Sequence, residues 1–158
     1  KMVQKKLVWA VLSDDTDYFA YGCGNILRYL SLSKETMVLY DLKSILTQLK
    51  ITQENLREIC VLAGTDYNKT DFNIHQVMKF YERYKRSGSK NEFYTWLDNE
   101  KLIDDYKSLI TVYSIYENTD SSEYNSVIKK MRNTTLSNRK VNIQDIKNIM
   151  IPEGFVFI

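Results

Sequence analysis

An uninterrupted apolar run that turns abruptly acidic is the feature that most constrains how this chain can fold. Residues 7–17 read LVWAVLSDDTD, with six apolar residues followed by a segment rich in aspartate. A short run rich in Val and Leu is typical of a strand buried on both faces, as in a parallel sheet covered by helices. Functional groups in open parallel sheets gather beyond the carboxyl ends of the strands. We therefore predict a strand over residues 7–12 and a functional site directly after it.

Three carboxylates, Asp14, Asp15 and Asp17, crowd this point. Close carboxylates repel one another, so a cation is needed to offset the repulsion, and the hard cation Mg²⁺ prefers oxygen ligands. Aspartate also caps helices and stabilises turns, so this stretch alone is equally compatible with capping. A second acidic position in the chain is Asp66, which lies in the turn Ala-Gly-Thr-Asp-Tyr after a helical segment. Taken alone, Asp66 is more typical of a turn than of a metal ligand.

The composition bounds the class of protein. With 158 residues, 44% of them apolar, the chain can form one domain with a core and is not disordered. A net charge of +2 argues against indiscriminate polyanion binding, so any nucleic-acid surface must come from local clusters. Cys23 and Cys60 are too few for a disulfide framework or a zinc site, which favours buried free thiols in an intracellular, reducing compartment. No apolar run is long enough for a membrane span.

Beyond residue 17 the pattern changes from short strands to helices. A strand is expected at 25–32 and another at 37–40, each bounded by turn residues. Asp41 and Thr52 are predicted to cap two helices, the second of which ends at Gly64. Further helices are predicted at 74–84, 91–97, 100–117, 123–131 and 143–149, and residues 155–158 are expected to form a short strand or a plug against the core.

Two segments carry local positive charge. Basic residues near helix ends can bind phosphates, although a solvated helix face is the favoured interpretation of either cluster taken alone. The first cluster consists of Lys79, Arg83, Lys85, Arg86 and Lys90, and the second of Lys129, Lys130, Arg132, Arg139 and Lys140.

Two motifs together resemble a known family. Residues 13–22, SDDTDYFAYG, are similar to the internal-region motif of flap endonucleases and XPG-type 5′ nucleases, and residues 56–68, LREICVLAGTDYN, resemble that family's helix ending in L-x-G-[ST]-D-Y. The likeness covers about residues 5–84. It implies an α/β fold in which residues 1–68 are the C-terminal part of a parallel-sheet, PIN-like nuclease core. Residues 69–158 would form a mostly helical DNA-binding region with a degenerate helix-two-turn-helix.

The resemblance also implies a chemistry. Asp15, Asp17 and Asp66 match metal-ligand and catalytic positions, whereas Asp14 occupies a neighbouring acidic position that is not a principal ligand. Two Mg²⁺ ions, which Mn²⁺ can replace, would generate a hydroxide from bound water and stabilise the leaving oxygen. The family's other acidic ligands lie N-terminal to this region, so the remainder of the nuclease domain is an expected partner. DNA binding is expected from Lys69, Asn73, His75, Lys79, Arg83, Lys85 and Arg86.

The resemblance implies a Mg²⁺-dependent, structure-specific 5′ nuclease that hydrolyses phosphodiester bonds in branched or nicked DNA. Such an enzyme would act during replication, recombination or repair, and replication proteins are expected as further partners. The family's G-x-G turn after Asp-Tyr is replaced by residues 69–75, KTDFNIH. Together with the richness in Lys, Asn, Ile and Tyr, this divergent turn makes the chain look like a viral branch of the family, of the poxvirus type. Such a protein would act in the host cytoplasm; otherwise a nuclear location is expected.

Two alternatives remain open at this point. One is a catalytically inactive DNA-binding or replication-partner module on the same fold, which the missing G-x-G turn favours. The other is a haloacid-dehalogenase-like phosphatase, because Asp15-Thr16-Asp17 after a strand resembles its nucleophile loop. Phe19, however, stands where that family has Thr or Val.

Overall fold

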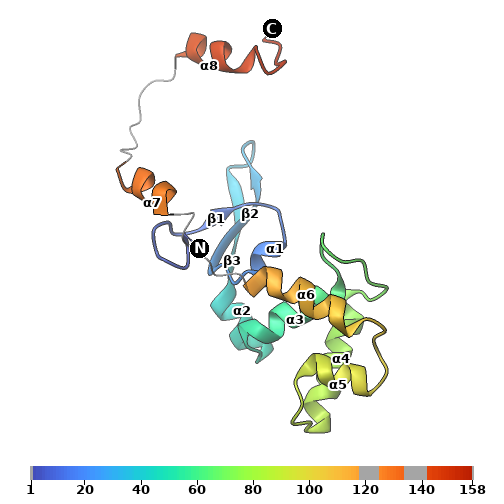
Figure 1. Ribbon diagram of the computed structural model, residues 1–158. Helices are drawn as coiled ribbons and strands as arrows, with labels where there is room; N and C mark the ends of the chain where they lie inside the picture. Colours follow the sequence, from blue (N-terminus) through green and yellow to red (C-terminus); the bar gives the residue numbers. More distant parts are fainter. Residues whose placement is uncertain (1, 118–124, 134–141, 158) are drawn as a thin grey trace. The chain divides into compact units, whose positions relative to one another are not determined.

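The computed structural model of the protein describes residues 2–117, 125–133 and 142–157 (Figure 1). The chain divides into two compact units, residues 1–123 and 124–158. All the predicted site residues lie in the first unit, which contains β1 (Val11–Leu12), α1 (Asp17–Ala20), β2 (Asn25–Ser31), β3 (Thr36–Asp41), α2 (Leu42–Leu49), α3 (Gln53–Ala63), α4 (Ile74–Ser87), α5 (Phe93–Asn99) and α6 (Tyr106–Glu117). The second unit contains α7 (Asn125–Arg132) and α8 (Ile143–Met150). The expected functional boundary between residues 68 and 69 stays a prediction.

A small mixed sheet forms the β part of the first unit. Its strand order is β1-β2-β3, with β1 parallel to β2 and β2 antiparallel to β3. The parallel register pairs Val11 with Ile26 and Leu12 with Leu27. The antiparallel hairpin of β2 and β3 accounts for most of the sheet, so an α/β fold is confirmed but the described sheet is not wholly parallel.

The predicted six-residue strand is wrong in length and in burial. Only Val11 and Leu12 pair with β2, because the backbone before them makes turn hydrogen bonds, such as those from Lys6 N to Val3 O and from Leu7 N to Met2 O. Trp9 is 65% exposed, so the run is not buried on both faces. Residues 7–10 therefore approach the sheet as irregular chain, and only the end of the apolar run enters it.

The two caps predicted from the sequence are confirmed. Asp41 Oδ1 accepts a hydrogen bond from Ser44 N at the start of α2. Thr52 and Asn55 form a reciprocal capping box at the start of α3. The same helix ends at Gly64, whose φ of +103° is a conformation that residues with a Cβ rarely adopt.

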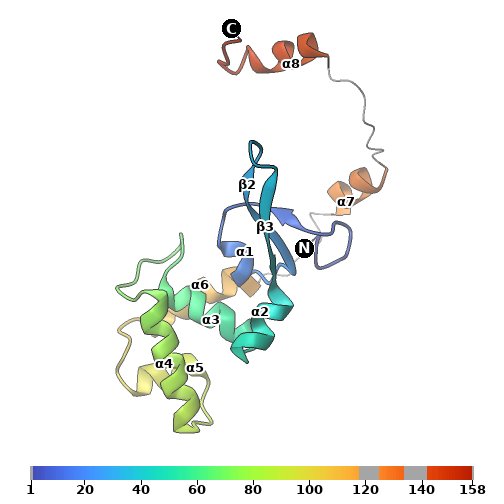
Figure 2. The same cartoon turned by 180° about the vertical axis from the view of Figure 1, so that it is seen from behind.

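Helix α3 lies at the centre of the helical packing. It contacts α1, α4, α5 and α6, and in both Figure 1 and Figure 2 α6 runs alongside it. Ile59 and Leu62 of α3 are fully buried with Val77, Phe93 and Leu97 in one hydrophobic core. Burying an aliphatic or aromatic side chain of this size stabilises the fold by about 1.5–3 kcal/mol. This core holds the C-terminal half of α3, and the turn that carries Asp66 follows that end of the helix.

Several later elements differ from the prediction in their bounds. Helix α6 begins at Tyr106 and not near 100, because Lys101 adopts a left-handed φ of +55° and Leu102 N bonds Leu97 O to end α5. Within the described part of the tail, residues 155–157 form no strand, and Val156 is 87% exposed. The start of the predicted helix at 123 and the basic residues Arg139 and Lys140 lie outside the described residues.

Two expectations from composition have structural counterparts. Cys23 is buried, Cys60 is half-buried, and both are free thiols; burial, with a smaller contribution from Asp17, raises the pKa of Cys60 to about 11.

No helix within residues 2–117, 125–133 and 142–157 is long and apolar enough to cross a membrane.

Candidate active site

The first acidic segment is shaped by a network of short-range hydrogen bonds. Ser13 N donates to Leu27 O and so extends the pairing of β1 with β2. Ser13 Oγ accepts from Asp15 N at 3.2 Å, and Asp15 Oδ1 accepts from Asp17 N at 2.9 Å. Asp15 therefore stabilises the turn that opens α1, which is the structural role that aspartate commonly has after a strand.

The short helix α1 is held in place by α3. Gln53 Nε2 donates to Phe19 O at 2.9 Å and to Ala20 O at 3.0 Å, and Arg57 Nε donates to Ala20 O at 3.2 Å. Gly22, with φ of +76°, turns the chain away after α1, and a Cβ there would lie 3.2–3.3 Å from the Gln53 side chain. These contacts satisfy carbonyls at the C-terminus of α1, so they fix the helix that begins with Asp17.

Asp66 is presented by a tight turn at the other end of α3. Thr65 and Asn68 bond each other through their backbones, with Thr65 N to Asn68 O at 3.2 Å and Asn68 N to Thr65 O at 3.3 Å. Asn68 Nδ2 also donates to Val61 O at 2.9 Å, which ties the turn to the last turn of the helix. Asp66 is exposed at the tip of this turn.

The structure brings the three predicted aspartates together. Asp15, Asp17 and Asp66 line one surface depression, which Lys69 and Asp71 also border. Burial raises the pKa of Asp17, the hydrogen bond from Tyr116 opposes this shift, and the charges of Asp15 and Asp66 add to it. The site therefore gathers negative charge from two distant segments of the chain, although the role of these residues as ligands stays a prediction.

The depression suits a metal ion in its donor chemistry but not in its spacing. Carboxylate oxygens suit Mg²⁺ or Mn²⁺, and a bound cation would favour the ionised form of Asp17, whose pKa is raised by burial and, to a smaller extent, by the charges of Asp15 and Asp66. Among the side chains that the structure describes, however, no three His, Cys, Asp or Glu residues are grouped closely enough to hold one ion. The aspartates thus offer the oxygen ligands that a hard cation prefers, but they do not by themselves form a closed three-ligand site.

Asp14 has a different role from its neighbours. Its Oδ1 accepts from Tyr29 N at 2.8 Å and lies 3.9 Å from Arg28 Nε, and its backbone carbonyl accepts from Arg28 Nη2 at 2.7 Å. Asp14 is therefore bound to β2, and it is not among the residues that line the depression.

Tyr116 of α6 is a site residue that the sequence analysis missed. Its hydroxyl donates to Asp17 Oδ2 at 2.7 Å, and the side chain is only 3% exposed. Its ring packs against Tyr21, with centroids 4.7 Å apart, and against Tyr67 at 6.0 Å. In the sequence Tyr116 belongs to an ordinary helical stripe, and nothing local points to a partner 99 residues away.

The residues predicted to bind DNA fall into two groups. Asn73 and Arg83 already have structural partners, since the Asn73 side chain caps α4 in a capping box and Arg83 Nη2 lies 2.6 Å from Glu100 Oε2. Arg86 makes a looser pair with Glu82 at 3.6 Å. The remaining predicted residues are exposed, on α4 or at the edge of the depression: Lys69, His75, Lys79 and Lys85.

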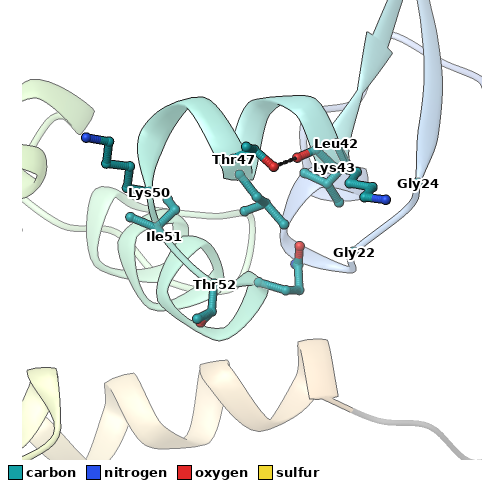
Figure 3. A pocket seen from close by; sticks show the side chains of 10 residues that line it. Gly22, Gly24, Leu42, Lys43, Thr47, Lys50, Ile51 and Thr52 are labelled. Atoms are coloured by element: carbon teal, nitrogen blue, oxygen red, sulfur yellow. Dashed lines mark hydrogen bonds between the residues drawn. The ribbon is translucent and has the colours of Figure 1, made fainter.

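A second hollow lies between α2 and the turns around Gly22 and Gly24 (Figure 3). Along α2, Thr47 Oγ1 donates to Lys43 O at 2.8 Å, so this hydroxyl is occupied within the helix. No carboxylate lines this hollow and none of the predicted site residues does, so it does not compete with the acidic depression as a cation site.

Comparison with known proteins points to one family. Residues 1–66 match the XPG I-region, which includes both the β1–α1 acidic segment and Asp66. This segment of the chain is therefore similar to flap endonucleases and XPG-type nucleases. Flap endonuclease 1 from Methanocaldococcus jannaschii is 40% identical over 67 residues, which is 42% of this chain and 21% of that protein. The chain thus spans about a fifth of the length of this relative.

Solved structures of the family share the fold. The flap endonuclease-1 structure from Methanococcus jannaschii matches 96% of this chain and 42% of its own, with a TM-score of 0.51 and 21% identity. The catalytic core of Rad2 in complex with DNA substrate matches 96% of this chain and 58% of its own, with a TM-score of 0.53 and 22% identity. The predicted fold class is therefore confirmed, and the similarity to these nucleases replaces the phosphatase alternative. The poxviral origin is unconfirmed.

Proposed function

We propose that this chain supplies part of the metal centre of a structure-specific 5′ nuclease that hydrolyses phosphodiester bonds in branched or nicked DNA. The observation that carries the proposal is that Asp15, Asp17 and Asp66, from two separate motifs, line one depression. The match to the XPG I-region supports it, because the relatives are named as endonucleases. Since the chain spans only part of those relatives, the proposal concerns the protein to which this chain contributes.

The three aspartates would each offer a carboxylate oxygen to Mg²⁺ or Mn²⁺, and members of this family are generally metal-dependent. Two such ions, when bound, supply a hydroxide nucleophile and stabilise the leaving oxygen of a phosphodiester. Asp15 and Asp17 are held by the turn and by α1, and Asp66 is held by the turn after α3. The incomplete ligand set supports the expectation that further acidic ligands come from the rest of the nuclease domain.

The basic residues near the depression are proposed to hold the DNA backbone. Lys69 borders the depression, while His75 and Lys79 lie on the exposed face of α4, opposite the buried residues Val77 and Tyr81. Lysine ammonium groups and imidazole N–H groups can donate to phosphates and so position the nucleic acid without reading its sequence. Replication proteins as partners, and a location in the host cytoplasm or the nucleus, stay predictions.

The test is cleavage of a DNA duplex with a 5′ flap in the presence of Mg²⁺. Replacing Asp15 or Asp66 by Ala in the full protein should abolish cleavage, because each change removes a proposed metal ligand. D14N is the matched control: Asp14 bonds β2 and does not line the depression, so measurable cleavage should persist. Unchanged cleavage by D15A and D66A would overturn the proposal.

An inactive DNA-binding module on the same fold is not favoured, because the relatives are named as nucleases. The absence of cleavage in Mg²⁺ and in Mn²⁺, with flap-DNA binding that needs no divalent ion, would restore that alternative.

A further inference from the structure

The buried phenol of Tyr116 connects the two acidic segments of the depression. Its hydroxyl donates to Asp17 Oδ2 at 2.7 Å. Its ring also contacts Tyr21, which follows α1, and Tyr67, which follows Asp66, with centroids 4.7 Å and 6.0 Å away. One side chain from α6 thus touches both segments that carry the aspartates.

We propose that Tyr116 is a positioning residue that holds the Asp17 carboxylate, and the spacing between the Asp17 and Asp66 segments, in the arrangement that binds the divalent ion. This inference rests on the proposed function. A carboxylate that is bonded at one oxygen has fewer rotamers available and keeps its other oxygen for a cation. Hydrogen bonds that orient a metal ligand commonly change metal affinity 10- to 100-fold when they are removed.

The hydrogen bond of the Tyr116 hydroxyl distinguishes a positioning role from ordinary core packing. Tyr116 would fill the same core space as Phe, so its burial alone does not require an oxygen atom. Tyr113, one turn earlier on α6, provides the contrast, since its hydroxyl accepts from Arg57 Nη1 at 3.4 Å and bonds no aspartate. Removing the hydroxyl from either tyrosine preserves the ring, but only one of the two changes touches the acidic depression.

The test measures the Mn²⁺ affinity of the full protein, including the rest of the nuclease domain, by electron paramagnetic resonance of free Mn²⁺, together with thermal unfolding without metal. Y116F should bind Mn²⁺ about 10-fold more weakly than the wild type, whereas Y113F should bind it with unchanged affinity. Both variants are expected to unfold at temperatures close to one another. Mn²⁺ affinity of Y116F equal to that of the wild type, or an equal loss in both variants, would overturn the inference.

D17N distinguishes failure of this inference from failure of the proposed function. If D17N weakens Mn²⁺ binding and Y116F does not, Asp17 is a ligand and Tyr116 does not position it. If the wild type and D17N bind Mn²⁺ equally, including no detectable binding by either, the proposed metal role of Asp17 is wrong, and the role of Tyr116 is overturned with it.

Discussion

The ionised Asp17 carboxylate has opposite effects on the stability of the fold and on metal binding. Asp17 has a raised pKa because it is partly buried and lies near Asp15 and Asp66. An acid whose pKa is raised by folding destabilises the folded state once it is ionised. The same carboxylate is a proposed metal ligand, so the charge that weakens the metal-free fold is the one that a cation requires.

Two glutamates of α3 give a test of this reasoning away from the site. Burial raises the pKa of Glu58, although a hydrogen bond from Asn55 opposes the shift, and the charges of Glu92 and Glu54 add to it. Stability from Glu58 is therefore fully present below about pH 4.5 and is lost as the pH rises through its folded pKa. We expect E58Q to unfold at a higher temperature than the wild type at pH 7, with the difference shrinking towards pH 4.

Glu54, in the first turn of α3, is the control with the opposite sign. Its pKa is lowered by hydrogen bonds from its own backbone N–H and from Thr52. Its stabilising effect is present above about pH 4.5 and lost as the pH falls through its folded pKa. E54Q should therefore lower the unfolding temperature at pH 7. Shifts of the same sign in E54Q and E58Q, followed by circular dichroism across pH 4–7, would contradict the assignment.

At the scale of elements, helix ends could be read from the sequence because their determinants are local. Asp41 and Thr52 were predicted as caps, and each bonds a backbone N–H three residues on. The apolar run before Asp14 failed as a predictor, since pairing of a strand depends on partners elsewhere in the chain. Only two of its residues pair with β2, although the run itself is uninterrupted.

The cap of α3 can be tested directly. T52A removes the hydroxyl that accepts from Asn55 N, and loss of such a cap typically destabilises a protein by about 1 kcal/mol. T47A is the matched control, because Thr47 Oγ1 bonds the Lys43 carbonyl within α2 and Ala is the better helix former. Urea unfolding should show a lower midpoint for T52A alone. Equal midpoints for the two variants would show that the capping box contributes little.

At the scale of the whole molecule, proximity of distant motifs could be expected only through the family resemblance. The resemblance implied that Asp66 would join Asp15 and Asp17, and the three line one depression. Tyr116 could not be found in this way, because a tyrosine in a helical stripe looks the same whether its hydroxyl meets a carboxylate or solvent. Long-range hydrogen bonds of this kind leave no pattern in the sequence that surrounds them.

The basic surface is expected to act collectively on DNA. Each phosphate neutralised by a cation contributes about 0.9 to the slope of log K against log salt concentration. K79A should reduce that slope by about 1, since Lys79 is exposed on α4. R83A should change it less, because Arg83 is paired with Glu100 and lies over Trp96. A larger effect of R83A than of K79A in a salt titration with flap DNA would contradict this ranking.

The bond between Tyr116 and Asp17 also orders events during synthesis of the protein. A ribosome makes the aspartate long before it makes the tyrosine, because the two are separated by 99 positions. Nascent chains that lack α6 therefore carry their acidic residues without the phenol that restrains one of them. The restraint that this bond places on Asp17 must wait until translation has passed residue 116, so a chain that terminates before that point lacks it however well α1 to α3 have folded.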